Sequence, residues 1–116
     1  GFTNDELVEF GRCYAKELDY SIDEKNGICN VLVTFSNTTR NLKVELTRKE
    51  FELLQYLIEN KGLVMSRNQI LCHVWGYDFD GETRTVDVHV RTLRQKLREA
   101  GNMVETIRGV GYRIGE

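Results

Sequence analysis

The segment RTVDVHVRTLRQKLR, residues 84–98, decides the fold of this chain. Its apolar residues are spaced four, three and four positions apart, which is the spacing of one side of an α-helix: Val86, Val90, Leu93 and Leu97. The same segment carries five basic residues and a single acid, Asp87. We therefore predict an amphipathic helix that ends near Arg98, with its apolar side on a core and a cationic side facing outward.

The outward side of this helix carries side chains that can contact a ligand: Arg84, Val88, Arg91, Thr92 and Gln95. DNA is the ligand that such a surface fits best, because an α-helix has the right diameter for the major groove. Arg91 and Arg94 can each donate two hydrogen bonds to guanine, although Arg94 borders the apolar side. Thr85 and Thr92 can contact phosphates or bases, and Val88 can contact a thymine methyl group.

A glycine-rich segment, RGVGYR, follows this helix and begins at Arg108. Residues 104–108 and 112–114 alternate between apolar and polar types, so we predict two strands joined by a tight turn. Because Gly109 and Gly111 have no side chain, the arginine and the backbone around it can approach a narrow minor groove closely. A helix in the major groove and an arginine-tipped hairpin beside it would contact two adjacent grooves.

Two shorter helices are predicted before residues 84–98, each from a capping box at its start. In a capping box the side chains of the N-cap residue and of the residue three positions later each accept a hydrogen bond from the other's backbone N–H. The first box is TRKE, from Thr47 to Glu50, and its helix should end near Gly62. The second box is SRNQ, from Ser66, and its helix should stop at Gly76. Both helices carry an apolar stripe, which comprises Phe51, Leu54, Leu57 and Ile58 in the first and Ile70, Leu71, Val74 and Trp75 in the second.

The N-terminal part is predicted to form an antiparallel sheet that is covered on one face. Between residues 19 and 46, β-branched and aromatic residues alternate with polar ones, and polar segments at 24–27 and 36–41 separate the runs. Residues 3–18 are compatible with an amphipathic helix and equally with strands broken at Gly11. The predicted order is sheet, three helices and hairpin, which is an α+β fold.

The length of 116 residues and the hydrophobic content of 41% predict one domain over residues 1–116. Its parts would be the sheet region at 1–46, the three-helix unit at 47–101 and the hairpin at 102–116. No apolar run is long enough to cross a membrane, so we expect no membrane partner.

Charge is distributed unevenly along the chain, although the net charge is only −2. Residues 1–60 hold seven Lys/Arg and eleven Asp/Glu, whereas residues 61–116 hold nine and seven. An acidic body with one local cationic surface favours a protein that binds nucleic acid by a single face.

Three cysteines, Cys13, Cys29 and Cys72, stand at wide and irregular spacings. This pattern fits neither a disulfide framework nor a pair of metal-binding thiols, and it is typical of the reducing cytoplasm. The sequence DFDGE at residues 78–82 resembles the start of a calcium loop, but its glycine stands at the fourth position instead of the sixth. We predict no metal, no cofactor and no enzymatic activity, since no nucleophile elbow or acid–base pair is evident either.

Several sequence blocks in register resemble the OmpR/PhoB-type winged-helix effector domain, the output half of bacterial two-component response regulators. The blocks are LTRKEFELL at 46–54, VMSRNQIL at 64–71, VWGY at 74–77, RTVDVHV at 84–90, LRQKL at 93–97 and IRGVGYR at 107–113. The resemblance implies a winged helix-turn-helix that binds double-stranded DNA sequence-specifically and regulates transcription within a phosphorelay. It also favours strands over a helix for residues 7–16.

The resemblance implies that residues 84–98 are the recognition helix and that the hairpin is the wing. DNA contacts are implied for Arg84, Thr85, Arg91, Thr92, Arg94 and Arg108, and the residues themselves add Val88, Gln95 and Gly109. It further implies a loop that touches RNA polymerase, formed by Trp75, Tyr77, Asp78, Phe79, Asp80 and Glu82. Two copies would bind a direct repeat side by side as a dimer.

Two features depart from the family pattern. Thr92 stands where many members have a basic residue, and residues 19–41 are longer than usual. The 116 residues hold no receiver domain, so the chain is either part of a longer regulator or a stand-alone effector.

Two alternative interpretations remain open from the sequence. A basic helix face is often only a solvated surface, and Asp87 could neutralise Arg84 or Arg91 at helical spacing. A winged-helix module could also bind protein instead of DNA, through the same helix face or through the aromatic loop.

Overall fold

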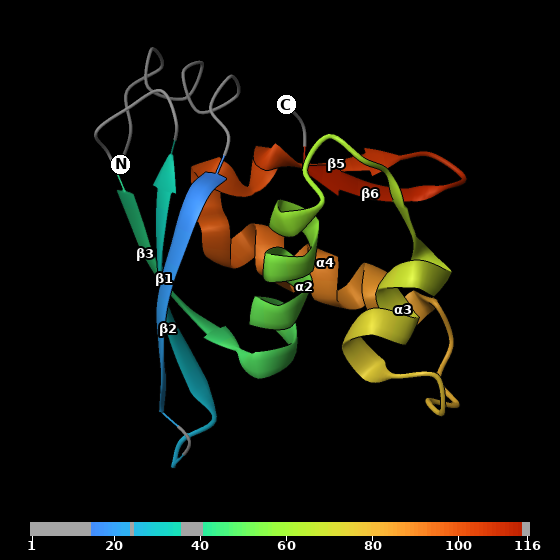
Figure 1. Cartoon of the computed structure of the whole chain (residues 1–116), viewed down its shortest axis with the longest axis horizontal. Coiled ribbons are helices and arrows are strands. Elements are labelled where there is room, and N and C mark those ends of the chain that lie inside the picture. Colours follow the sequence, from blue (N-terminus) through green and yellow to red (C-terminus); the bar gives the residue numbers. More distant parts are fainter. Residues whose placement is uncertain (1–14, 24, 36–40, 115–116) are drawn as a thin grey trace.

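The computed structural model describes residues 15–23, 25–35 and 41–114, and it shows the predicted order of sheet, three helices and hairpin (Figure 1). The first sheet contains β1 (Ala15–Asp23), β2 (Ile28–Phe35) and β3 (Asn41–Thr47) in that order, with both pairs antiparallel. Alternation along β2 buries Cys29, Val31 and Val33 and leaves Asn30 exposed. The predicted antiparallel sheet with one covered face is confirmed.

Of the two alternatives for residues 3–18, the strands are confirmed and the helix is wrong for the last part, because Ala15–Leu18 belong to β1 and pair with β2. These residues find backbone partners on a neighbouring strand, and such pairing overrides a local helical spacing. The rest of that segment, including the strands expected at 7–14, lies outside the described residues.

Both predicted capping boxes are present. In α2 (Arg48–Glu59), the Thr47 hydroxyl accepts from the Glu50 N–H at 3.3 Å, and Glu50 Oε1 accepts from the Thr47 N–H at 2.8 Å. In α3 (Arg67–Trp75), the same exchange joins Ser66 and Gln69, at 3.1 and 2.8 Å. These local bonds satisfy N–H groups that have no partner inside the helix.

The helices end close to the predicted positions. α2 ends at Glu59, before the predicted Gly62, and α3 ends at Trp75 with Gly76 following at φ 95°. α4 (Arg84–Leu97) ends one residue before the predicted Arg98, which adopts φ 55° and starts a 3₁₀ helix, η1 (Arg98–Met103). The sequence did not predict η1.

The hairpin consists of β5 (Val104–Ile107) and β6 (Gly111–Ile114), as predicted. A short strand that was not predicted, β4 (Met65–Ser66), pairs with β6 and completes a second sheet in the order β4-β6-β5. Gly111 is needed there, since a Cβ at this position would overlap the carbonyl oxygen of Met65. The hairpin is therefore anchored to the chain just before α3.

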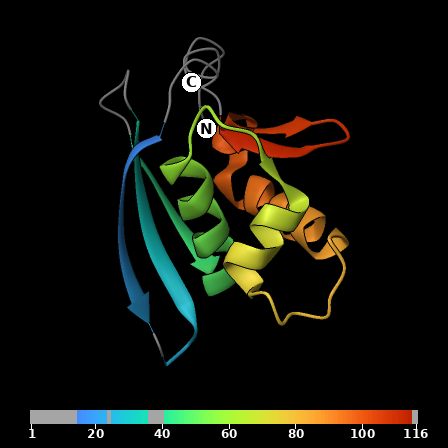
Figure 2. The same ribbon diagram turned by 45° about the vertical axis from the view of Figure 1, so that its right-hand side comes forward.

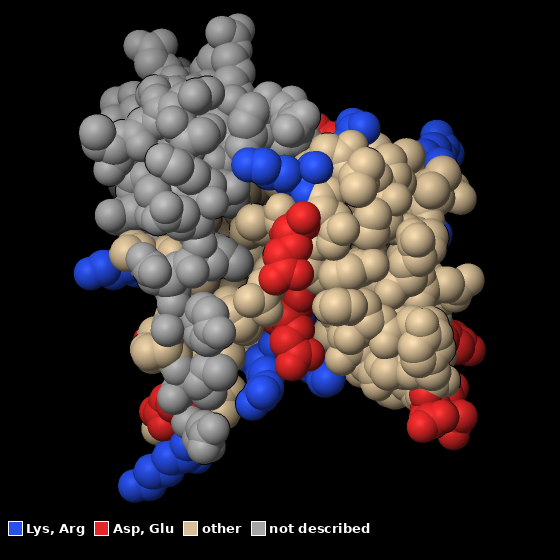
Figure 3. Space-filling model, in the orientation of Figure 1, with Lys and Arg blue, Asp and Glu red and all other residues tan. Residues whose placement is uncertain are grey.

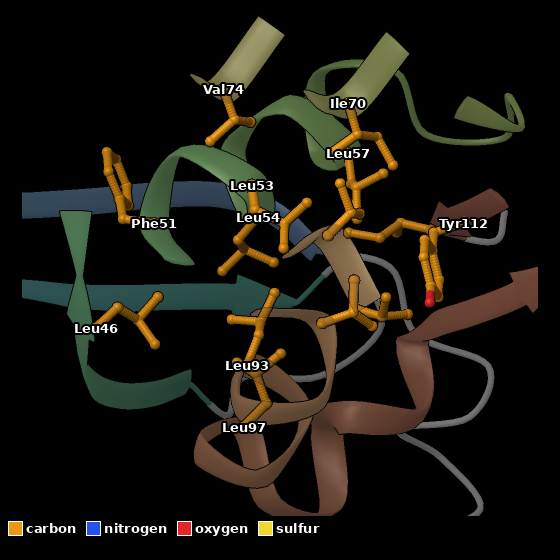
Figure 4. Close-up of a cluster of buried hydrophobic side chains, with 14 of the residues drawn as sticks. Leu46, Phe51, Leu53, Leu54, Leu57, Ile70, Val74, Leu93, Leu97 and Tyr112 are labelled. Atoms are coloured by element: carbon orange, nitrogen blue, oxygen red, sulfur yellow. The ribbon is translucent and has the colours of Figure 1, made fainter. Parts of the chain in front are cut away.

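One apolar cluster lies between the helices and both sheets (Figures 2 and 4). Figure 4 shows side chains of α2, α3 and α4 pointing toward one another, with Leu46 of β3 and Tyr112 of β6 at the edges. In Figure 2 the first sheet forms one outer layer and α2 lies against it. Within the described part of the chain, no helix has the length and apolar content needed to span a bilayer. The predicted α+β class is confirmed.

Candidate nucleic-acid interface

The exposed side of α4 carries four of the side chains that the sequence pointed to: Arg84, Val88, Arg91 and Gln95. They project outward because Val86, Val90, Leu93 and Leu97, which alternate with them at helical spacing, are buried in the core. Val88 is 52% exposed, so its methyl groups are accessible from solvent. The result is a surface with two guanidinium groups, one amide and one methyl-rich side chain.

The two arginines of this face have no direct partner in the part of the chain that the structure describes. Among the described residues, neither Arg84 nor Arg91 forms an ion pair or a side-chain hydrogen bond. The alternative interpretation, in which Asp87 forms an ion pair with Arg84 or Arg91, is therefore wrong. The Oδ1 atom of Asp87 instead accepts from Nε of Arg67 at 2.8 Å and from the hydroxyl of Tyr112 at 2.5 Å. The cationic face is therefore available to a ligand.

Two threonines flank this face and are half-buried. The Thr92 hydroxyl donates to the carbonyl oxygen of His89 at 3.1 Å, and Nδ1 of His89 lies 2.8 Å from the carbonyl oxygen of Thr85. The Thr92 hydroxyl proton is thus used inside the helix, while the Thr85 side chain has no hydrogen bond within the described residues. Both residues lie at an edge of the exposed face, and neither lies at its centre.

Arg94 does not project from the helix as a guanine-reading arginine would. Its Nε and Nη2 atoms donate to the carbonyl oxygen of Val104 at 3.0 and 2.7 Å, and Nη2 also donates to the Thr106 hydroxyl at 2.7 Å. Its guanidinium carbon lies 5.7 Å from the ring centroid of Tyr112. In this structure Arg94 fastens α4 to β5, a contact that its place beside the apolar stripe makes possible.

The tip of the hairpin holds Arg108 and Gly109, both exposed. A turn closes there with a hydrogen bond from the Val110 N–H to the Ile107 carbonyl at 2.9 Å, and Gly109 adopts φ 77°, which L-residues rarely adopt. The Arg108 side chain has no ion pair among the described residues. Figures 1 and 2 both show the hairpin tip and the N-terminal end of α4 on the same side of the molecule.

The loop between α3 and α4 is exposed and acidic. Tyr77 is 91% exposed, and the loop acids Asp78, Asp80 and Glu82 are exposed too. Figure 3 shows acidic side chains at the lower right, where Figure 1 draws this loop. A second group of acidic side chains lies over α2, whereas the surface over α3 is largely uncharged. Trp75, the first residue of the predicted contact loop, is the last residue of α3, which confirms the helix end predicted at Gly76.

Ring contacts of Trp75 and Phe79 hold the α3–α4 loop against α4. The Trp75 ring makes an edge-on contact with the His89 ring of α4, with centroids 4.8 Å apart, and it lies 6.1 Å from the Phe79 ring. Within the described residues, no three His, Cys, Asp or Glu side chains gather in a way that could hold a metal ion.

Sequence reasoning missed Arg67 and Tyr112, which join Asp87 in a hydrogen-bonded network beside the exposed face of α4. Burial raises the pKa of the Asp87 carboxyl, but the hydrogen bonds from Tyr112 and Arg67 outweigh it and lower that pKa below its ordinary value. Burial and then the Asp87 carboxylate raise the pKa of the Tyr112 phenol. No sequence signal could have paired these residues, since 20 and 25 positions separate Asp87 from its partners.

Comparison with known proteins gives one consistent result. Residues 41–114 match the family described as "Transcriptional regulatory protein, C terminal". The chain is 48% identical over 95 residues to the response regulator ArlR of Staphylococcus aureus, an overlap of 80% of this chain and 43% of ArlR, so it spans less than half of that relative.

Solved structures agree with this comparison. The DNA-binding domain of Bacillus subtilis CssR superimposes with a TM-score of 0.57 at 38% identity, covering 83% of this chain and 99% of that one. The DNA-binding domain of AdeR, in complex with an intercistronic region, gives a TM-score of 0.62 at 30% identity, covering 88% and 99%. This chain belongs to the family of OmpR/PhoB-type C-terminal domains of transcriptional regulatory proteins.

Proposed function

We propose that this chain is the DNA-binding output domain of a transcriptional response regulator. α4 enters the major groove, and the tip of the β5–β6 hairpin enters the adjacent minor groove. One observation carries the proposal: Arg84 and Arg91 on α4 and Arg108 on the hairpin are exposed and form no ion pair among the described residues. Solved structures of related domains in complex with DNA support the same function.

The exposed face of α4 supplies the base contacts in this proposal. Arg91 donates to guanine, Val88 packs on a thymine methyl group and Gln95 reaches an adenine edge or a phosphate. Arg84 and Thr85 are proposed to contact phosphates, together with the Gly109 backbone of the hairpin. Thr92 would reach a phosphate only by turning its hydroxyl away from the His89 carbonyl oxygen, to which it donates in this structure. Arg94, because it is bonded to β5, supports the interface instead of reading a base.

The test starts with selection of bound sites from random duplexes, followed by titration of the best site. Arg91→Ala and Arg108→Ala should each weaken binding about tenfold or more, since a good arginine contact is worth about 1–3 kcal/mol. Arg48→Ala is the matched control, because Arg48 is also exposed but stands at the start of α2 and pairs with Glu52. Equal effects of all three substitutions would contradict the proposal.

Salt dependence separates DNA binding from the alternative, a protein-docking module. A domain that neutralises phosphates loses affinity steeply as salt rises, and the log–log slope should become shallower by about one for each phosphate-contacting arginine that is removed. A flat salt response, with no duplex enriched, would favour protein docking instead. Selected sites should contain a direct repeat with a spacing of one helical turn, which would show two copies bound side by side.

The loop between α3 and α4 is proposed to contact RNA polymerase. Its exposed Tyr77 and the acids Asp78, Asp80 and Glu82 offer an aromatic and acidic surface. Tyr77→Ala should leave duplex binding within about twofold and lower transcription from a promoter that carries the selected site. Reduced duplex binding by this variant would place the loop at the DNA instead.

A further inference from the structure

A single carboxylate oxygen joins three elements next to the proposed interface. Oδ1 of Asp87, in the first turn of α4, accepts from Nε of Arg67 at 2.8 Å and from the Tyr112 hydroxyl at 2.5 Å. Arg67 is the first residue of α3, and Tyr112 belongs to β6. Asp87 therefore holds the start of α3 and one strand of the hairpin against the N-terminal turn of α4.

The other strand of the hairpin is fastened to the same helix. Arg94, seven residues after Asp87, donates two hydrogen bonds to the Val104 carbonyl and one to the Thr106 hydroxyl of β5. The guanidinium carbons of Arg67 and Arg94 lie 5.9 and 5.7 Å from the ring centroid of Tyr112. Both strands of the hairpin are thus tied to α4 by charged, directional contacts.

The base of the hairpin is also held by the pairing of β6 with β4 and by Val104, Tyr112 and Ile114 in the core, but these contacts do not extend to its tip. Its strands are four residues each, and its tip, with Arg108, Gly109 and Val110, is exposed. A rotation of a few degrees where the strands meet α4 would displace the Arg108 side chain at the tip. Contact with two grooves at once requires the spacing between helix and tip to be fixed before binding, because ordering it on binding costs affinity.

Electrostatic repulsion alone predicts that Asp87 weakens DNA binding. A carboxylate on a helix that faces a polyanion repels the phosphates within the screening length of about 8 Å, so its removal should strengthen binding. The Asp87 side chain is 38% exposed, so part of this repulsion persists in the folded domain. A negative charge at this position needs a compensating role, and the bonds to Arg67 and Tyr112 supply one.

We propose that Asp87 is a positioning residue for DNA recognition: through Tyr112 and Arg67 it fixes the hairpin, and with it Arg108, at the spacing from α4 that a specific duplex requires. The inference rests on the proposed DNA-binding function. It distinguishes Asp87 from the contact residues of α4, because its effect on affinity must pass through the hairpin.

The decisive experiment compares two duplexes, the selected site and a scrambled duplex of equal length, at one salt concentration. Asp87→Asn should weaken binding to the selected site about tenfold, a loss of about 1.4 kcal/mol, and leave binding to the scrambled duplex equal or stronger. Asp80→Asn is the matched control, since it removes the same charge from the exposed α3–α4 loop. This control should leave selected-site binding equal or slightly stronger. A rise in selected-site affinity for Asp87→Asn would overturn the proposal.

A double-mutant cycle tests the route through the hairpin. If Asp87 positions Arg108, the loss of affinity caused by Arg108→Ala should be smaller in the Asp87→Asn background than in the wild type, by a factor of about three or more. Independent contributions, which multiply within about twofold, would overturn the proposed route even if each single variant binds more weakly. A role in global stability alone would not produce this coupling under conditions in which every variant is folded.

Tyr112→Phe keeps the experiment decisive if Asp87→Asn unfolds. It removes only the hydroxyl that bonds Asp87, while the ring remains in the core, and it changes no charge at neutral pH. Selected-site binding should fall and scrambled-duplex binding should stay unchanged, with circular dichroism confirming the fold; equal selected-site binding would overturn the proposal. A wild-type protein that binds both duplexes equally would instead refute the proposed function itself.

Discussion

Glu50 connects the start of α2 to α4, and its replacement should destabilise the domain in a pH-dependent way. The residue is only 3% exposed, and its Oε1 atom accepts from the Thr47 N–H at 2.8 Å and from Nζ of Lys96 at 2.6 Å. Glu50→Gln keeps the size of the side chain and an oxygen that can cap Thr47. It removes the negative charge that faces Lys96.

The expected cost follows from these two contacts. A hydrogen bond to a charged group contributes about 1.5–3 kcal/mol and a neutral one about 0.5–1.5 kcal/mol. Lys96 is 40% exposed, so water can solvate its ammonium group in the variant and the loss stays moderate. We expect Glu50→Gln to lower the free energy of unfolding by about 1–2 kcal/mol at neutral pH. Glu52→Gln is the control and should cost about 0–1 kcal/mol, because Glu52 forms only surface ion pairs.

The sign of the pH dependence comes from the carboxyl of Glu50. Burial raises its pKa, but hydrogen bonds, chiefly those from Lys96 and from the Thr47 backbone, outweigh burial and leave the pKa lowered. The folded state therefore binds this proton less readily than the unfolded state does. The stabilisation is present above the unfolded pKa of about 4.3 and is lost as the pH falls through the folded value.

Urea denaturation followed by the fluorescence of Trp75, the single tryptophan, measures these free energies. The difference between the wild type and Glu50→Gln should be largest near pH 7 and shrink at pH values below about 4. The reasoning is refuted if Glu50→Gln is as stable as the wild type at pH 7, or if the difference stays constant at acidic pH.

Three further predictions concern the core, the hairpin and a buried thiol. Leu93→Ala should lower the free energy of unfolding by about 2–5 kcal/mol in urea denaturation, because Leu93 is fully buried, whereas Val88→Ala on the exposed side should change it by less than about 0.5 kcal/mol. Gly111→Ala should lower the thermal midpoint more than Gly109→Ala, because a Cβ at Gly111 would overlap the backbone of β4. A Cβ at Gly109 has open space, so this variant bears only the cost of a left-handed φ, about 1–2 kcal/mol. Equal shifts of the midpoint would argue against the close approach of β4 and β6. Burial raises the pKa of the Cys29 thiol, so in a variant whose other two cysteines are alanine this thiol should react with a maleimide only after urea is added, and rapid labelling in buffer would show that β2 opens readily.

Features set by near neighbours in the chain were predictable. The capping boxes at Thr47 and Ser66 form between residues three positions apart, and the apolar stripe of α4 follows from the helical period alone. The turn at Gly109 likewise needs only local backbone geometry. For the same reason the helical period is sufficient to identify the exposed positions of α4, including Arg84 and Arg91.

Features set by distant residues were not predictable. Helical spacing offered Asp87 two partners on its own helix, but folding brings Arg67 and Tyr112 closer. Arg94 looked like a base-reading arginine, and its partners on β5 became visible only in the tertiary structure. The pairing of β4 with β6 likewise joins segments that two helices separate.

The sequence by itself determined the helices, the order of the elements and the residues of α4 that face solvent, because these depend on interactions within a few positions of the chain. Only the tertiary structure decided which of the charged residues remain free for a ligand. Packing chooses among all charges that come within bonding distance, and it left Arg84, Arg91 and Arg108 without an ion pair in the described chain while engaging Arg67 and Arg94 inside the fold.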